Sequence, residues 1–286
     1  MFTATLKGTA VYVENSSAPA RKPVTVPSLH AMKAEGRKIV MLTAYDTSFA
    51  AQVEHAGVDI ALVGDSLGMV VQGQRSTLPV TLEQMVYHVT MVSRGLSATL
   101  LAADMPFMAD RSVDFALEAG ARLVGEAGAA MVKIEGAAPH ILEAIHALTE
   151  RVIPVCAHLG LTPQSVHKFG GYKVQGRAQD DAERVLSEAL AVQQAGASLL
   201  VLEGVPSALG ERVTKALDIP VIGIGAGPQC DGQVLVIYDM LGITPGKRPK
   251  FSKDFLAGRA SVAEAIGAFV ADVRNGAFPS AEHSYN

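Results

Sequence analysis

The stretch EAGAAMVKIEG at residues 126–136 contains, in order, the end of a helix, an apolar strand and a terminal acid. Two other stretches repeat this order: HAGVDIALVGD at 55–65 and QAGASLLVLEG at 194–204. In all three, Ala-Gly follows a helical pattern, and glycine is a common residue where a helix ends and the chain reverses. The repeat therefore predicts helix–strand units whose strands end in acidic residues.

Eight aliphatic or β-branched runs predict eight strands. These runs lie at 39–45, 59–64, 98–103, 129–134, 152–158, 198–202, 219–224 and 233–238. Most are continuously apolar, which is typical of parallel strands covered on both faces. Helix-start signals between them predict helices over 81–94, 113–127 and 181–195, the first with a capping box from Thr81 to Gln84.

The alternation predicts an α/β fold built from βα units, and eight parallel strands are the number that closes a (β/α)8 TIM barrel with outer helices. A doubly wound open sheet has the same local signals and usually fewer strands, so it stays as the alternative. No linker-like segment interrupts the pattern between Ser28 and Gly246. We expect a flexible N-terminal leader at 1–27, followed by a single catalytic barrel at 28–286 that ends in a helical tail.

Composition narrows the class of protein. The 286 residues are 49% hydrophobic and 18% charged, which excludes a disordered chain. A net charge of −4 argues against a general nucleic-acid or anionic-membrane binder. The two cysteines form no CxxC pair, and no run approaches 18 apolar residues. These features predict a cytoplasmic protein that binds neither membranes nor nucleic acids.

Charged residues gather at the predicted carboxyl ends of the strands, where barrel enzymes carry their catalytic groups. They are Asp65, Asp104, Lys133, Glu135, His158 and Glu203. Strand side chains alternate, so Lys133 and Glu135 should both face the barrel interior. Four carboxylates at one mouth would repel each other unless a cation lies between them, and oxygen ligands suit Mg²⁺. Such an ion can act as a Lewis acid for a 2-oxo acid, with a remaining carboxylate as base.

Structural interpretations of the same residues stay open at this point. A single acid at a strand end is often a helix cap or a salt-bridge partner. Lys133 is either a counter-ion for Glu135 or a Schiff-base nucleophile. His158 fits a packing role as well as a chemical one.

A series of unusual motifs resembles the ketopantoate hydroxymethyltransferase family. They are TAYD (43–46), LVGDSLGM (62–69), STLPVT (76–81), ADMPFM (103–108), MVKIEG (131–136), HLGLTPQ (158–164), FGGYKVQGR (169–177), LVLEG (200–204) and PVIGIGAG (220–227). The resemblance covers nearly the whole chain except the leader. It implies a (β/α)8 barrel and a Mg²⁺-dependent transfer of a hydroxymethyl group from 5,10-methylenetetrahydrofolate to 3-methyl-2-oxobutanoate. The product, 2-dehydropantoate, belongs to pantothenate and coenzyme A synthesis.

The resemblance also implies roles for particular residues. Asp65, Asp104 and Glu135 match the family's metal-site acids, and the two aspartates count among its substrate-binding residues as well. Ser66 and Lys133 match groups that hold the oxygens of the oxo acid.

Glu203 matches the family's general base, and His158 lies at a position close to the substrate. The family further implies a homodecamer made of pentameric rings. A Mg²⁺-dependent 2-oxo acid C–C lyase of the isocitrate lyase and phosphoenolpyruvate mutase type is the alternative function, since it shares the barrel and an acid-rich metal site.

Overall fold

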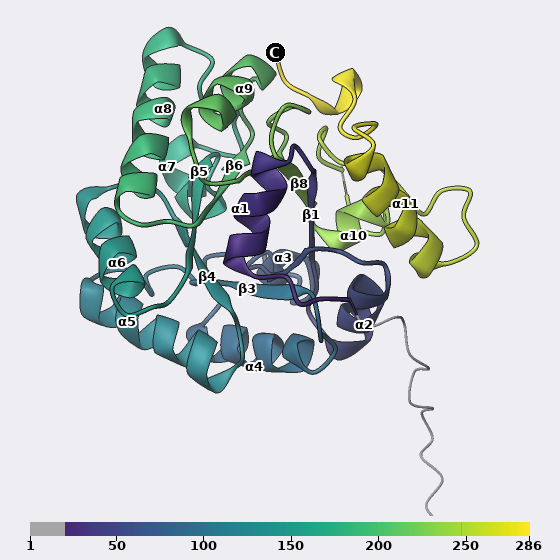
Figure 1. Ribbon diagram of the computed structural model, residues 1–286, viewed down its shortest axis with the longest axis horizontal. Helices are drawn as coiled ribbons and strands as arrows, with labels where there is room; N and C mark the ends of the chain where they lie inside the picture. Colours follow the sequence, from purple (N-terminus) through teal and green to yellow (C-terminus); the bar gives the residue numbers. More distant parts are fainter. Residues whose placement is uncertain (1–20, 247) are drawn as a thin grey trace, which may run out of the picture.

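The computed structural model describes residues 21–246 and 248–286, and its eight strands close into one barrel (Figure 1). Neighbouring strands pair in parallel and in chain order, and β8 pairs with β1. The strands are β1 (Ile39–Thr43), β2 (Ile60–Val63), β3 (Leu100–Asp104), β4 (Met131–Glu135), β5 (Val155–Gly160), β6 (Leu199–Glu203), β7 (Val221–Ile224) and β8 (Gly232–Leu235). The predicted TIM barrel is confirmed, and the open doubly wound sheet is excluded.

The longer helices form a ring around the barrel (Figure 1). The helices are α1 (Val26–Ala34), α2 (Thr47–His55), α3 (Leu67–Val70), α4 (Leu82–Ser93), α5 (Val113–Ala121), α6 (Pro139–Thr149), α7 (Val166–Phe169), α8 (Gln179–Gln194), α9 (Ser207–Ala216), α10 (Ile237–Met240) and α11 (Val262–Arg274). Short turns η1 (Arg122–Glu126), η2 (Pro163–Ser165) and η3 (Ala281–His283) complete the elements. In the described part of the chain, each helix is too short or too polar to cross a bilayer.

Helix boundaries follow the local signals closely. The capping box of α4 is present, since the Thr81 side chain accepts from the Gln84 backbone N–H and the Gln84 side chain accepts from Thr81. The helix expected over 113–127 divides instead into α5 and the π-helical turn η1, which begins at Arg122. The sequence pattern gives no sign of this change from α-helical to π-helical hydrogen bonding, because α5 and η1 both bury one face.

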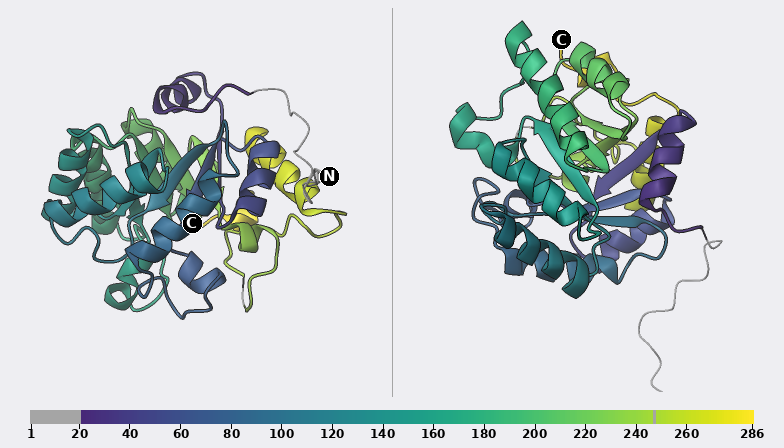
Figure 2. Two further views of the ribbon diagram at one scale, coloured as in Figure 1. Left: turned by 90° about the horizontal axis from the view of Figure 1, so that it is seen from below. Right: turned by 60° about the vertical axis from the view of Figure 1, so that its left-hand side comes forward.

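The strands separate two apolar layers. Alternate strand residues fill the barrel interior, and the intervening ones pack against the outer helices. The interior layer consists of Ile39, Met41, Ile60, Leu62, Leu100, Ala102, Met131, Cys156, Leu199, Val201, Ile222, Ile224 and Val234. Leu29 and Met32 of α1 belong to the same cluster, so α1 closes the amino end of the barrel. Figure 2 shows α1 lying across that end, outside the ring.

The expected leader falls mostly on residues 1–20, which lie outside the described residues. Its last residues are described, and they are ordered against the barrel. Arg21 donates to the Val58 carbonyl at 2.7 Å and to Thr99 Oγ1 at 2.8 Å. Val26 and Pro27 already belong to α1. The boundary at residue 27 therefore cuts through the first helix.

Candidate active site

A polar layer lies above the apolar interior at the carboxyl ends of the strands, here called the mouth. Asp104, Lys133 and His158 continue the inward-facing positions of β3, β4 and β5, and all three are buried. Strand register places Asp104 beside Lys133 and Glu135 beside His158. Parallel pairing and the two-residue period thus bring side chains from distant parts of the chain together.

Lys133 is paired with an aspartate. Its Nζ donates to Asp104 Oδ1 at 2.6 Å, and each of the two side chains is 5% exposed. The other oxygen of Asp104, Oδ2, accepts the backbone N–H of Asp65 at 3.0 Å. The counter-ion of Lys133 is therefore Asp104, and not the Glu135 that the spacing suggested.

Gln164 joins two other acids. Its amide nitrogen donates to Asp65 Oδ2 at 2.9 Å, and its backbone N–H donates to Glu135 Oε2 at 3.1 Å. The sequence analysis missed this residue, because an uncharged glutamine in a loop gives no electrostatic signal. Its only signal was its place in the HLGLTPQ motif.

His158 lies between two glutamates. Its Nδ1 is 3.3 Å from Glu135 Oε1, and its Nε2 is 3.2 Å from Glu203 Oε2. Neither contact is aligned as a hydrogen bond, since both ring nitrogens and Glu135 Oε1 are buried without a hydrogen-bond partner. Buried polar atoms of this kind are uncommon and often mark a place where a ligand or water completes the set.

Ser66 is the N-cap residue of α3, but its side chain makes no capping hydrogen bond to that helix. Its Oγ lies 2.8 Å from the Tyr45 hydroxyl. Tyr45 is 1% exposed, and burial raises the pKa of its phenol, so it stays a neutral hydrogen-bonding group. Tyr45 is a second residue that the analysis of charged strand ends did not select, although TAYD was among the family-like motifs.

The pKa values of the residues at the mouth reflect both their burial and the excess of acidic side chains there. Burial, followed by the charges of Asp104 and Glu135, raises the pKa of Asp65 well above its usual value. Burial also raises the pKa of Glu135 to about 7, although Lys133 acts in the opposite direction. Burial alone would lower the pKa of Lys133, but the carboxylates of Asp104, Glu135 and Asp65 raise it. Lys133 therefore stays an ammonium ion.

Burial shifts the pKa values of His158 and Glu203 in opposite directions. Burial, then the charge of Lys133, lowers the pKa of His158, so the neutral imidazole is favoured. Burial raises the pKa of Glu203, while the contact with His158 opposes that change. A carboxylate with a raised pKa beside a neutral imidazole is a plausible proton acceptor.

Aromatic residues cover part of the mouth. The Tyr172 hydroxyl, on the loop after α7, donates to Met69 Sδ of α3 at 3.3 Å. Burial, followed by the charges of Glu203, Asp65 and Glu135, raises the pKa of Tyr172. The C-terminal segment reaches the same end, where the Tyr285 carbonyl accepts from the Ser207 backbone N–H at 2.9 Å.

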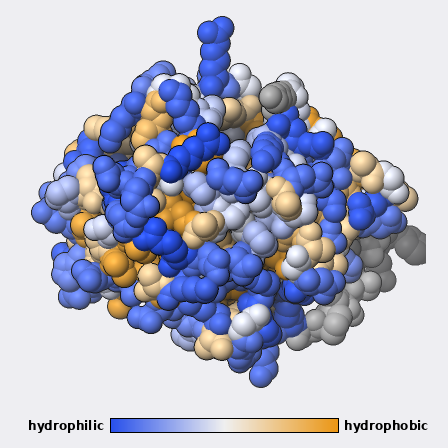
Figure 3. Space-filling view, turned by 90° about the horizontal axis from the view of Figure 1, so that it is seen from above, coloured by the Kyte–Doolittle hydropathy of each residue, from blue (hydrophilic) through white to orange (hydrophobic). Residues whose placement is uncertain are grey.

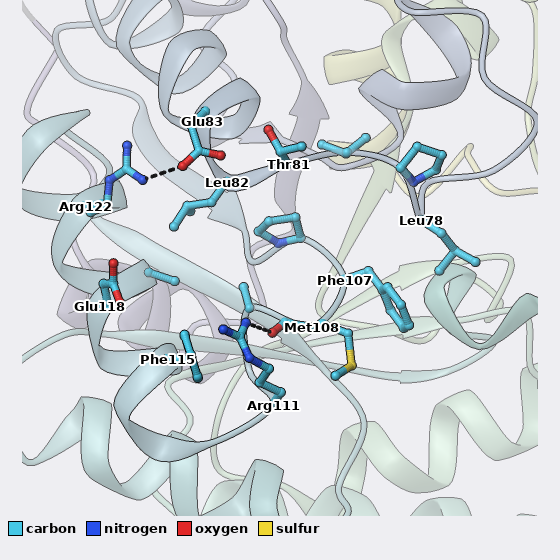
Figure 4. Close-up of a pocket in the computed structure, with 15 residues that line it drawn as sticks. Leu78, Thr81, Leu82, Glu83, Phe107, Met108, Arg111, Phe115, Glu118 and Arg122 are labelled. Carbon is cyan, nitrogen blue, oxygen red and sulfur yellow. Dashed lines mark hydrogen bonds and ion pairs between the residues drawn. The ribbon is translucent and has the colours of Figure 1, made fainter.

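Two open hollows of the described chain are lined by residues other than the charged ones of the mouth. One, of about 410 Å³, is lined by the loops around residues 78–83 and 106–111 and by α5 (Figure 4). Phe107, Met108 and Phe115 there are exposed hydrophobic residues. The other hollow, of about 510 Å³, is lined by Arg177 and Arg212 among others. The face in Figure 3 is mostly hydrophilic, with hydrophobic residues in scattered patches.

The carboxylates do not form a complete metal site by themselves. Within residues 21–246 and 248–286, no group of three or more His, Cys, Asp or Glu side chains stands in a metal-ligating arrangement. Gln164 donates to one oxygen of Asp65 and one oxygen of Glu135, whereas both oxygens of Asp104 accept hydrogen bonds, from Lys133 and from the Asp65 backbone N–H. The structure brings the predicted charged residues together at one mouth.

Solved structures with a similar fold include a phosphonomutase and a lyase. A putative phosphonomutase from Burkholderia cenocepacia aligns with a TM-score of 0.59 and 17% identity, covering 76% of this chain and 95% of that chain. A 2,3-dimethylmalate lyase, described as a PEP mutase/isocitrate lyase superfamily member, aligns with a TM-score of 0.55 and 20% identity, covering 76% and 82%. At these identities the likeness concerns the fold alone.

Sequence comparison is more specific. A protein from Xanthomonas axonopodis pv. citri named 3-methyl-2-oxobutanoate hydroxymethyltransferase is 59% identical over 271 residues, covering 94% of this chain and 99% of that protein. A protein of the same name from Alkalilimnicola ehrlichii is 55% identical over 265 residues, covering 93% and 95%. The family model described as ketopantoate hydroxymethyltransferase matches residues 23–281. The chain therefore belongs to the ketopantoate hydroxymethyltransferase family.

Proposed function

We propose that this chain transfers a hydroxymethyl group from 5,10-methylenetetrahydrofolate to 3-methyl-2-oxobutanoate, giving 2-dehydropantoate. The observation that carries the proposal is the mouth itself, where buried acids surround one ammonium group and a carboxylate–imidazole pair. Relatives at 59% and 55% identity bear the corresponding name.

The donor set fits Mg²⁺. Asp65, Asp104 and Glu135 offer only oxygen. Burial, followed by the charges of Asp104 and Glu135, raises the pKa of Asp65, and a bound cation would oppose that rise. Mg²⁺ is usually bound by one or two carboxylates together with water and substrate oxygens, so a complete protein cage is not required. When bound, the ion would supply a Lewis acid beside the carbonyl of the oxo acid.

Glu203 is assigned as the general base. It would accept the proton on C3 of the oxo acid, and the electron pair of that C–H bond would become the C2=C3 bond of an enolate. The raised pKa of Glu203 makes it a stronger base than an exposed carboxylate. His158 Nε2 lies 3.2 Å from that carboxylate, and burial favours the neutral imidazole.

Lys133 and Ser66 are assigned to the oxygens of the oxo acid. The buried ammonium of Lys133 offers a fixed positive charge where the C2 oxygen becomes negative, and Asp104 holds it in place at 2.6 Å. Because the pKa of Lys133 is raised, it is a poor Schiff-base nucleophile. The Ser66 hydroxyl, paired with Tyr45, can donate to the carboxylate of the oxo acid.

Proton exchange tests the base. Incubating the protein with 3-methyl-2-oxobutanoate in heavy water should exchange the C3 proton only when Mg²⁺ is present. Glu203→Gln should abolish the exchange, while Glu211→Gln, an exposed acid paired with Lys215, should leave it unchanged. Exchange that survives EDTA, or a borohydride-trapped adduct on Lys133, would support an imine mechanism instead.

Folate dependence separates the transferase from the lyase alternative. A lyase would cleave a 2-oxo acid derivative without any one-carbon donor, whereas 2-dehydropantoate should form only when 5,10-methylenetetrahydrofolate is added. The likeness to solved lyase structures supports only a shared fold. We therefore keep the transferase, and not the lyase, as the proposed function.

The anionic tail of the folate is assigned to the loop that carries Lys173 and Arg177. Arg177 also lines the hollow of about 510 Å³, together with Arg212. The double variant Lys173→Ala/Arg177→Ala should raise the KM for the folate several-fold and leave folate-independent proton exchange unchanged. The exposed Lys215→Ala is the control. An unchanged folate KM would exclude this loop as the folate site.

We further propose a cytoplasmic homodecamer, as the family resemblance implies. Both cysteines are free and buried, which suits a reducing compartment. Exposed Phe107, Met108 and Phe115 offer an apolar surface for a subunit contact. Sedimentation equilibrium should give a mass of ten chains, and a monomer at working concentration would contradict this assembly.

A further inference from the structure

Gln164 holds together four strand ends at the mouth. From the loop after β5, its amide nitrogen donates to Asp65 Oδ2 at 2.9 Å and to the Met105 carbonyl at 3.0 Å. Its backbone N–H donates to Glu135 Oε2 at 3.1 Å. Asp65 follows β2, Met105 follows β3, and Glu135 ends β4. One residue thus fixes the relative positions of two of the three proposed metal acids.

The hydrogen-bond partners of the Gln164 side chain permit only one orientation of its amide group. Ionised Asp65 and the Met105 carbonyl are both acceptors, so only the NH2 side of Gln164 can face them. Gln164 is the second residue of η2 after Pro163, where a backbone N–H has no partner within the helix. Glu135 supplies that missing partner. The side chain and the backbone of Gln164 therefore serve different acids.

An uncharged donor suits this position better than a cation would. Lysine or arginine here would neutralise the acids permanently and compete with a metal ion. The amide of Gln164 instead donates a hydrogen bond to Asp65 Oδ2 and adds no charge. It occupies Oδ2 of Asp65 and Oε2 of Glu135, which leaves the second oxygen of each carboxylate to another ligand. Glu135 Oε1 is buried and has no hydrogen-bond partner.

We propose that Gln164 is a positioning residue that orients Asp65 for binding a divalent cation, while its backbone orients Glu135. The proposal rests on the proposed function, in which these acids bind Mg²⁺. Residues that orient a ligand through a hydrogen bond commonly change metal affinity by about 10- to 100-fold. The side chain should act through Asp65 alone, because any substitution at 164 other than proline keeps the backbone N–H.

The test measures binding of Mn²⁺ alone, as a spectroscopic substitute for Mg²⁺, to the full chain. Gln164→Met keeps the length of the side chain and removes the donor. It should weaken Mn²⁺ binding by about 10-fold or more, measured by electron paramagnetic resonance or calorimetry. The effect should be smaller than that of Asp65→Ala, which removes a ligand. Gln179→Met, an exposed glutamine that bonds only to Glu183 on α8, should bind Mn²⁺ like the unmodified chain.

Thermal midpoints in EDTA separate positioning from simple loss of structure. If Gln164→Met loses its fold, Gln164→Ala makes the same deletion with a smaller side chain. An Mn²⁺ affinity within twofold of the unmodified chain would overturn the positioning role, even with a lowered thermal midpoint. Failure of the unmodified chain to bind Mn²⁺ would instead overturn the metal site of the proposed function, so the two failures are distinguishable.

Discussion

Burial shifts the pKa values of several residues of the mouth, and the direction depends on the sign of the charge. It raises the pKa of Glu135 and Glu203 and lowers that of His158. Lys133 is the exception, because surrounding carboxylates outweigh its burial. The result is a neutral imidazole, a permanent ammonium ion and acids that gain a proton more readily than exposed ones.

The pH dependence of proton exchange should report Glu203. Only its ionised form can accept the C3 proton, so exchange should fall as the pH drops through its raised pKa. His158→Leu removes a contact that lowers this pKa, and should move the acid limb upward by about one pH unit. The measurement is the exchange rate between pH 5 and 9, with the exposed His146→Gln as control. An acid limb that stays in place would show that His158 does not influence the base.

Glu135 should make the metal-free protein less stable as pH rises. Its pKa is about 7 in the folded chain, against about 4.3 when unfolded, so between these values the folded state binds more protons. Its contribution to the free energy of unfolding therefore falls across that window. At pH 8, Glu135→Gln should be more stable than the unmodified chain by about 2 kcal/mol.

Denaturant unfolding in EDTA at pH 5 and pH 8 measures this difference. Near pH 5 most of Glu135 is protonated in the folded chain, so the two proteins should differ little. A variant that is less stable than the unmodified chain at pH 8 would contradict the buried-charge explanation. Asp272→Asn is a matched control, since Asp272 forms a partly exposed ion pair with Lys253.

At the scale of elements, strands were easier to predict than the end of the barrel. Apolar runs, most of them continuous, identify β1 to β8 to within a few residues, because burial on both faces leaves a strong signal. Helix α1 has no comparable signal, since only Leu29 and Met32 are buried in it. Its packing depends on the shape of a barrel end that forms from the whole chain, and a local pattern cannot show that.

Helix α1 should contribute stability without affecting the site. Leu29 is fully buried against the barrel interior at the amino end, opposite the mouth. Leu29→Ala should lower the free energy of unfolding by about 3 kcal/mol through lost burial and a residual cavity. Glu35→Ala, at an exposed ion pair with Arg37, should change it by less than about 0.5 kcal/mol. Altered Mn²⁺ affinity in Leu29→Ala would show that the two ends of the barrel are coupled.

At the scale of the whole molecule, the topology of a barrel decides which residues meet. The sequence places Asp65, Asp104, Lys133, Glu135, His158 and Glu203 at strand ends, and a closed parallel sheet needs nothing further to gather them. The barrel topology does not determine which of these six side chains pair with one another. Lys133 lies beside Asp104, and the uncharged Gln164 reaches Asp65, because strand register and loop geometry select partners that charge alone does not distinguish.

The excess of acids should make the stability of the whole protein depend on divalent cations. A ligand that binds only the folded state stabilises it by about 2.7 kcal/mol at 100 times its dissociation constant. Mg²⁺ at that level should raise the thermal midpoint by roughly 3–6 °C for a chain of this size. The shift should be larger at pH 8 than at pH 5, because protons compete for Asp65 and Glu135, whose pKa values are raised.

Asp65→Asn should lose most of this shift in the thermal midpoint. Asp272→Asn should keep it, because Asp272 is far from the proposed ligands in sequence and pairs with Lys253. A shift of equal size at both pH values, or one retained by Asp65→Asn, would place the cation elsewhere on the molecule.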